Sequence, residues 1–478
     1  EASIAGGLSD ARLGTALDFP KNLFTAFAPT HAIHAKEVHT RLCPPSVCQG
    51  AARTDFRGRM RSLLSDTSVA YGHLVYPADQ RFRLPPIGEN WSGFTLEQLD
   101  GNRVLSGWGR REQDVEEFIK SLGSDGPRPA VHFLHVLLPH APWNHLPSGR
   151  RYSLGNGFAD IREDDWVGVD AWPKDEDLVA RAYQRHLLQV GYVDSVLGRV
   201  IARLKEAGLW DRAVFAVMAD HGADFTPGEL RRRATAGNAG GVMSVPLLIR
   251  APAQCHGIAD DRVAELIDVL PTVAALAGAP LPWPVDGRSL IDTPVPGRHP
   301  RLLAGAGEAV IEPGLTGLAA ARRLVLDRKL ALFGAGNDAD RDVFYRMGPA
   351  PGLVGRSTAS LPHRVEAGLR LEISDRAALE RVALSSDFVP ARVTGRLRGF
   401  RQDAPAPFVA LSLNGRIRSV VRGFVVPEGG VGFTAMLPEE DFREGRNDLR
   451  AFAVDPRHRD TLIAGNEPIP EFHRLREL

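Results

Sequence analysis

The chain has 478 residues, of which 44% are apolar and 24% charged, and these proportions are typical of a globular protein with more than one domain. Lysine and arginine together number 58, as do aspartate and glutamate, which argues against a protein that binds nucleic acid through a broad basic surface. No segment approaches the ~18 consecutive apolar residues of a membrane-spanning helix.

The N-terminus and the cysteines suggest a cellular location. The chain begins at Glu1 with neither an initiating methionine nor the features of a signal peptide, so we expect that sequence upstream was processed away or is not included. Among the three cysteines, Cys43 and Cys48 are five positions apart and Cys255 is isolated. The close pair fits either a disulfide in an extracytoplasmic protein or two reduced thiols.

An alternation of apolar strands and helices predicts the fold of the larger part of the chain. Leu23–Phe27 is strand-like, and three short apolar runs have the pattern of strands buried on both faces: 131–138, 213–219 and 245–249. Two helices are predicted, at 177–207 and 267–277. The apolar stripe of the first consists of Val190, Val193, Leu197, Ile201 and Leu204. This order predicts an α/β domain over 1–347 with a doubly wound, mostly parallel sheet.

The remainder of the chain has a different pattern. A segment rich in proline, glycine and serine predicts a linker at 348–379. Short alternating runs come after it, and Asn414-Gly415 between two of them is a strong hairpin signal. We therefore predict a small antiparallel β-sandwich over 380–456 and a C-terminal tail over 457–478.

Polar side chains come directly after two of the predicted strands. His140 comes after the first apolar run, and Asp220-His221-Gly222 ends the second. Ligands of open parallel sheets bind at the carboxyl ends of strands, and a carboxylate beside an imidazole can bind a divalent cation. The alternatives are that Asp220 caps a helix, His221 is merely exposed and His140 is a loop histidine.

Other charged and imidazole side chains are weaker candidates. Arg231, in a run of three arginines, could attract an anionic substrate, although a solvated run is the simpler interpretation. His31, His34, Glu37 and His39 lie close in sequence, but a turn at Pro29-Thr30 favours surface or pocket-lining histidines over a metal cluster. His145 lies near His140 and could face the same site.

Seven short motifs, taken in order, resemble one enzyme family over about residues 20–295. They are 137–143 around His140, 192–198, 204–211, 219–222 around Asp220, 244–247, 268–272 and 286–290. The set resembles the sulfatase-like branch of the alkaline phosphatase superfamily, and is most similar to bacterial membrane-anchored members related to lipoteichoic acid synthases.

The resemblance implies a fold, a mechanism and residue roles. A metal-activated hydroxyl group would attack sulfur or phosphorus, and water or an acceptor alcohol would resolve the covalent intermediate. Asp220 and His221 would be ligands of a divalent metal ion (calcium, magnesium, manganese or zinc). His140 would contact the anionic oxygens or the leaving group. Trp143 would line the pocket, unless it is a core aromatic residue.

The nucleophile expected by resemblance is missing from this sequence. The segment 2–27 resembles the stretch after the nucleophile helix of the family, so we expect the first strand and the nucleophile upstream of Glu1. Cys43-Pro44-Pro45-Ser46-Val47 imitates the sulfatase Cys-x-Pro-Ser-Arg motif, but Val47 replaces the arginine that stabilises the modified cysteine. A structural loop is therefore the better interpretation of these residues.

Two functions from different classes are compatible with these features. The first is a hydrolase or transferase acting on sulfate or phosphate esters, with cell-envelope glycans or lipids as candidate substrates. The second is an inactive relative that binds an anionic glycan or a protein partner. A phosphomutase-like enzyme would need further ligands beyond Asp224. In both main cases we expect an extracytoplasmic protein of the bacterial envelope, no nucleic-acid partner, and membrane contact only through a segment outside this chain.

Overall fold

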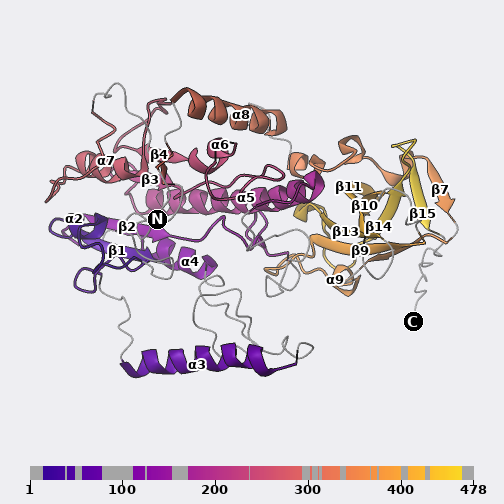
Figure 1. Ribbon diagram of the computed structural model, residues 1–478, viewed down its shortest axis with the longest axis horizontal. Coiled ribbons are helices and arrows are strands. Elements are labelled where there is room, and N and C mark those ends of the chain that lie inside the picture. The colour runs from indigo at the N-terminus through magenta and orange to yellow at the C-terminus, as the bar shows by residue number, and fades with distance from the viewer. Residues whose placement is uncertain are drawn as a thin grey trace. The chain divides into compact units, whose positions relative to one another are not determined.

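The computed structural model describes residues 14–37, 40–48, 56–77, 111–123, 126–152, 171–235, 237–292, 302–303, 310–311, 315–333, 341–366, 368–373, 376–399, 407–425 and 431–465. The chain divides into two compact units. The first consists of 1–140, 168–172 and 194–327, and the second of 141–167, 173–193 and 328–478. Figure 1 labels most of the helices and strands of the two units.

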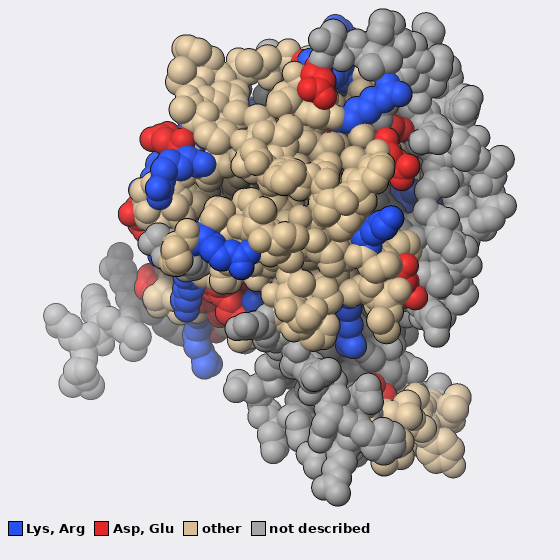
Figure 2. Space-filling view, turned by 90° about the vertical axis from the view of Figure 1, so that its left-hand side faces the viewer, with Lys and Arg blue, Asp and Glu red and all other residues tan. Residues whose placement is uncertain are grey.

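The first unit has mixed α/β content. Its elements are α2 (Leu23–Phe27), β1 (Ala32–Glu37), α3 (Phe56–Val75), α4 (Arg111–Ser121), β2 (Ala130–His135), β3 (Phe215–Met218), α6 (Ala239–Met243), β4 (Leu247–Arg250), α7 (Val269–Leu276), β5 (Leu302–Leu303) and β6 (Val310–Ile311). Two helices, α5 (Glu176–Glu206) and α8 (Leu315–Phe333), run through both units. On the face that carries α2 and α7, uncharged side chains fill the centre and charges of both signs lie around the rim (Figure 2).

The strands of this unit have the predicted parallel arrangement only in part. β1 and β2 pair in parallel, with Ala32 opposite Ala130. β3 and β4 instead pair antiparallel, with Phe215 opposite Arg250, which corrects the parallel arrangement expected for these two runs. No residue of β2, β3 or β4 is fully buried. The pattern of apolar runs predicted the strands correctly, but it contains no information on their relative direction.

The strand-like segment Leu23–Phe27 is a helix, and the reason lies in its cap. The Asn22 side chain accepts hydrogen bonds from the backbone N–H groups of Phe24 and Thr25, at 2.9 and 3.1 Å. The Thr25 hydroxyl accepts in return from the Asn22 N–H at 3.1 Å, which completes a capping box. This local hydrogen bonding outweighs the β-preference of the aromatic side chains, and the strand begins later, at Ala32.

The predicted long helix is confirmed as α5, although its buried stripe is shifted. Tyr192, Val196, Val200 and Leu204 are buried at four-residue steps, whereas Val190 is exposed. Gly208, with φ of 66°, adopts the left-handed conformation predicted for the residue that ends the helix.

Two loops of the first unit are fixed by side-chain hydrogen bonds to the backbone. Cys43 and Cys48 form a disulfide, so Cys43 has no thiol with which to act as a nucleophile. Glu37 accepts hydrogen bonds from the N–H groups of Leu42 and Cys43, at 3.0 and 2.9 Å, and holds the start of the disulfide loop against the end of β1. His39 lies outside the described residues.

A second loop is anchored on α7, and two of the resembling motifs meet there: 268–272 at the start of the helix and 286–290 in the loop. The buried Asp268 carboxylate accepts from the N–H groups of Glu265 and Arg288, both at 2.8 Å. The Thr272 hydroxyl donates to the Asp268 carbonyl oxygen at 2.6 Å and accepts from the Leu290 N–H at 2.9 Å. These motif residues therefore connect two segments of the backbone.

The second unit contains two antiparallel sheets, apart from one parallel pair. Its elements after α8 are β7 (His363–Glu366), β8 (Arg370–Ile373), α9 (Arg376–Glu380), β9 (Arg392–Arg398), β10 (Phe408–Leu413), β11 (Arg416–Arg422), β12 (Phe424–Val425), β13 (Val431–Met436), β14 (Leu449–Val454) and β15 (Leu462–Gly465). One sheet has the order β11-β10-β14-β15-β7, and the other β12-β13-β9-β8. β15 and β7 are the parallel pair.

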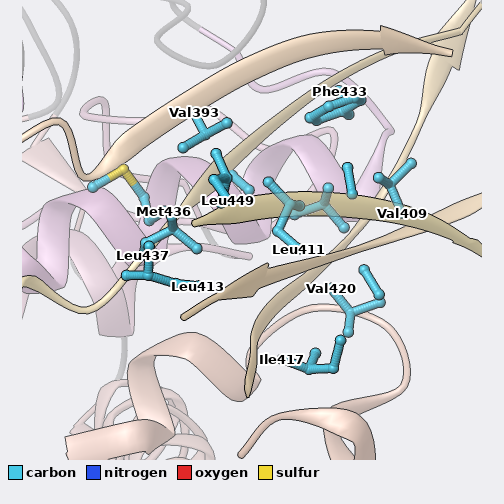
Figure 3. Close-up of a cluster of buried hydrophobic side chains, with 14 of the residues drawn as sticks. Val393, Val409, Leu411, Leu413, Ile417, Val420, Phe433, Met436, Leu437 and Leu449 are labelled. Atoms are coloured by element: carbon cyan, nitrogen blue, oxygen red, sulfur yellow. The ribbon is translucent and has the colours of Figure 1, made fainter. Parts of the chain in front are cut away.

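Side chains from both sheets form one apolar core. Leu397, Val409, Leu411 and Ile417 are completely inaccessible to solvent. Figure 3 shows part of this cluster, with Leu411 of β10 and Phe433 of β13 among the labelled side chains. Two sheets that share one apolar core are the part of the predicted sandwich that the structure shows.

The predicted hairpin and the bounds of the sandwich can be compared with the strands. Asn414-Gly415 joins β10 to β11, with φ of 51° and 86°, as the two-residue hairpin signal predicts. β7 and β8 lie within 348–379, the predicted linker, and β15 lies within the predicted tail. The strands of this unit after α8 therefore extend from His363 to Gly465. The three short strands outside the predicted bounds, β7, β8 and β15, were not predicted because they lack a clear apolar alternation.

Candidate functional site

His140 lies beyond the end of β2, and a buried cation holds its backbone. Arg111, at the start of α4, is 2% exposed and donates from Nη1 to the His140 carbonyl oxygen at 2.9 Å. Burial lowers the pKa of Arg111 to about 9, so its guanidinium is still charged at neutral pH. Pro139 and Pro142 flank this segment and have no N–H to donate. A charged side chain thus fixes a loop that is poor in backbone donors.

Asp220 and His221 lie beyond the end of β3. The His221 N–H donates to Asp220 Oδ1 at 2.9 Å, and His221 Nδ1 lies 2.8 Å from the Gly222 carbonyl oxygen. A Cβ atom on Gly222 would lie 2.1 Å from the Gly241 carbonyl oxygen. Glycine is therefore required here by the close approach of another backbone segment, in addition to the sharp turn expected from the sequence.

The Arg232 side chain contacts both histidines that lie beyond the ends of β2 and β3. Its Nη1 lies 3.2 Å from His140 Nε2, and its Nη2 lies 2.7 Å from His221 Nε2. A guanidinium has only donors, so both Nε2 atoms act as acceptors in this arrangement. Arg232 is itself exposed. The structure therefore gathers a cation and two imidazoles at one accessible point of the first unit, with Asp220 Oδ2 3.8 Å from His221 Nε2.

The neighbouring Arg231, which the sequence singled out, lies elsewhere. Its guanidinium carbon lies 5.5 Å from the centre of the Trp172 ring, and its carbonyl oxygen accepts from the Asp224 N–H at 3.0 Å. The same run of three arginines contains Arg232. No periodic rule applies in an irregular loop, so the sequence could not show which arginine contacts the histidines. Arg111 had no sequence signal at all.

Trp143 and His145 are packed within the second unit. Trp143 is 4% exposed, its ring makes an edge contact with His186, and its carbonyl oxygen accepts from Arg185 Nη2 at 2.8 Å. His145 is 3% exposed, and its ring stacks on Tyr192 at 4.8 Å between centres. These contacts are those of packed aromatic side chains. The predicted roles of both residues in substrate binding remain predictions.

The described residues do not by themselves make a metal site. Within the described part of the chain, no group of three or more His, Cys, Asp or Glu side chains could hold a metal ion. Asp220 and His221 supply two candidate ligands, but the Arg232 guanidinium contacts the His221 Nε2 lone pair that a metal would need. A divalent ion at this point would require further ligands and a displacement of Arg232.

Comparison with known proteins bears on the same region. The family model described as Sulfatase matches residues 96–279, which include all three of the gathered residues. The multifunctional alkaline phosphatase superfamily protein PehA of Trinickia caryophylli is 34% identical over 101 residues, 21% of this chain and 19% of that protein. Iduronate 2-sulfatase of Mus musculus is 26% identical over 172 residues, 30% of this chain and 31% of that protein.

Among solved structures, a phosphonate monoester hydrolase from Silicibacter pomeroyi matches 91% of this chain and 74% of its own, with 16% identity and a TM-score of 0.33. The chain spans less than a third of the length of the two curated relatives. Residues 96–279 are therefore similar to the Sulfatase family, and shorter segments are similar to a protein of the alkaline phosphatase superfamily and to a sulfatase.

Proposed function

We propose that this chain carries the anion-binding part of a hydrolase or transferase that acts on sulfate, phosphate or phosphonate monoesters. One observation carries the proposal: Arg232 lies between the imidazoles of His140 and His221 at an exposed point of the segment that is similar to the Sulfatase family. A fork of N–H donors flanked by two imidazoles matches the oxygens of a tetrahedral anion.

The three side chains would have separate roles. Arg232 would move its donors from the imidazoles to two oxygens of the ester and stabilise their negative charge. His140, freed from the guanidinium, would hold a proton at Nε2 and donate it to the leaving oxygen. Arg111 would keep the His140 backbone in place through its bond to the carbonyl oxygen. The nucleophile would come from outside the described residues.

Metal dependence and location belong to the same proposal. Asp220 and His221 would contribute to a divalent-metal site only together with ligands from other parts of the protein. The disulfide between Cys43 and Cys48 supports an extracytoplasmic location, because such bonds persist in oxidising compartments. Envelope glycans or lipids, as substrates of a membrane-anchored relative of lipoteichoic acid synthases, would fit that location.

A second function is favoured by the position of Arg232 itself. A cation that already contacts the imidazole of a candidate metal ligand is compatible with a protein that binds an anionic glycan and does not turn it over. This alternative predicts anion binding without hydrolysis, whatever metal ion is supplied.

The test is steady-state kinetics of the full-length gene product on nitrophenyl sulfate, phosphate and phosphonate esters, with a panel of divalent ions. Arg232→Gln should lower kcat/KM by about 10²–10³, the usual effect of removing a donor to a developing oxyanion. Arg233→Gln, one residue away and also exposed, is the matched control and should stay within about twofold.

The outcomes separate the two functions. Turnover that is lost in Arg232→Gln and kept in Arg233→Gln supports the enzyme. Sulfate binding by calorimetry that needs Arg232, without turnover, supports the binding protein. If the wild-type protein neither turns over any ester nor binds sulfate, both functions are wrong.

A further inference from the structure

Helix α3 (Phe56–Val75) exposes an apolar face. Its large exposed apolar side chains are between 39% and 77% accessible: Met60, Leu63, Leu64, Tyr71, Leu74 and Val75. At 3.6 residues per turn these six positions fall within an arc of about 120°. Val69, on the opposite side of the helix, is 2% exposed. The apolar side of α3 therefore faces solvent, the reverse of a helix that packs on its own domain.

The charge of α3 is concentrated at one end. Positions 57, 59 and 61 are arginines, and the first acidic residue of the helix is Asp66. The remainder of the helix adds only His73 as a further basic group. A helix with an apolar arc and clustered arginines has the composition of one that lies in the plane of an anionic membrane surface.

We propose that α3 docks on an anionic lipid bilayer, with its apolar arc inserted among the headgroups and acyl chains. No helix in the described part of the chain is long and apolar enough to cross a membrane, so α3 would lie parallel to the surface. The membrane contact predicted from the sequence was confined to a segment outside the chain. The apolar arc of this second contact consists of described residues, and the contact does not depend on the proposed function.

Charge selects the bilayer over a second copy of the chain. The sequence of this helix has three arginines, at positions 57, 59 and 61, against one acidic residue, Asp66, so two copies have the same net positive charge and repel each other in either orientation. An anionic bilayer instead supplies opposite charge for the basic residues, together with an apolar phase for the arc.

The test is co-sedimentation of the full chain with vesicles. The protein should bind vesicles that contain phosphatidylglycerol, bind vesicles of phosphatidylcholine alone far more weakly, and dissociate as salt is raised. The double variant Leu64→Asp/Leu74→Asp should lower the partition coefficient by more than about tenfold, because two exposed apolar side chains would no longer enter the bilayer.

The matched control is Ile258→Asp, which makes the same kind of change at a position that is 80% exposed outside α3. It should bind as the wild type does. Since all three positions are exposed, the variants should keep the wild-type melting temperature, which shows that they fold.

Three results would overturn the proposal. The first is that the wild-type chain does not bind anionic vesicles. The second is equal binding by the double variant. The third is a wild-type dimer by light scattering that Leu64→Asp/Leu74→Asp converts to a monomer, because α3 would then pair with a second copy. Loss of ester turnover has no bearing on any of these results.

Discussion

The strands of the sandwich and the strands of the α/β unit differ in burial. Every residue of β13 and all but one residue of β10 and of β14 are buried. β2, β3 and β4 also consist mainly of apolar residues, yet none of their residues is fully buried. An apolar strand sequence therefore does not by itself show that the strand is buried. The sandwich has the features of a region stabilised by packing, whereas the α/β unit presents polar strand ends at an accessible point.

Shortening one leucine in each region tests whether the difference in burial sets the difference in stability. Leu411→Ala in β10 should lower the free energy of unfolding by about 2–5 kcal/mol, because its side chain is completely buried. Leu134→Ala in β2, a half-buried position, should lower it by about 1 kcal/mol. Because two units can unfold separately, hydrogen exchange in each should be followed during urea unfolding. Equal effects would show that burial does not distinguish the regions.

Two glycines of the α/β unit should respond in opposite ways to replacement by alanine. Gly222→Ala should cost about 1–3 kcal/mol and weaken sulfate binding, since its Cβ would overlap the Gly241 carbonyl oxygen beside His221. Gly198→Ala in α5 meets open space and should stabilise the helix by about 0.5–1 kcal/mol. Thermal unfolding and sulfate calorimetry measure both effects. A stable, sulfate-binding Gly222→Ala variant would contradict the close approach.

The anchored loop gives a smaller effect in the same unit. Thr272→Val removes the two hydrogen bonds that its hydroxyl makes to Asp268 and Leu290, and should cost about 1–2 kcal/mol. Ser289→Ala is the control, because the buried Ser289 Oγ makes no hydrogen bond within the described structure. It should change stability by less than about 0.5 kcal/mol. The prediction fails if the two variants unfold alike.

The smallest effect concerns a turn at the edge of the sandwich. The Arg457 N–H holds the pKa of Asp455 below its usual 3.8, with further help from the His458 N–H and Arg364. The carboxylate thus contributes stability above pH 3.8 that is lost as the pH falls through its lower folded pKa. Asp455→Asn should flatten the acid limb of the stability curve, whereas Asp460→Asn should leave it steep. Identical acid limbs for Asp455→Asn and the wild type would contradict the shift.

Local patterns predicted the elements that local chemistry controls. The existence of α5, its terminal glycine and the Asn414-Gly415 hairpin needed only nearby residues. The strand prediction for Leu23–Phe27 is wrong because the Asn22 capping box starts a helix there.

The features that depend on distant contacts were not predictable in this way. The antiparallel pairing of β3 with β4 joins segments separated by an irregular loop. The sequence indicated His140, Asp220 and His221 as candidates because they come directly after apolar runs. It could not identify Arg232, which reaches both imidazoles from that loop, or Arg111, which contacts His140 from a separate helix.

In the proposed function, Arg232 and the imidazoles of His140 and His221 bind one tetrahedral anion. A crystal structure of the chain grown with tungstate tests it most directly, because the anomalous signal of tungsten locates the anion without ambiguity. We predict a tungstate whose oxygens are within hydrogen-bonding distance of the Arg232 guanidinium and at least one of the two imidazoles. Tungstate bound elsewhere, with Arg232 still between the two histidines, would contradict the account.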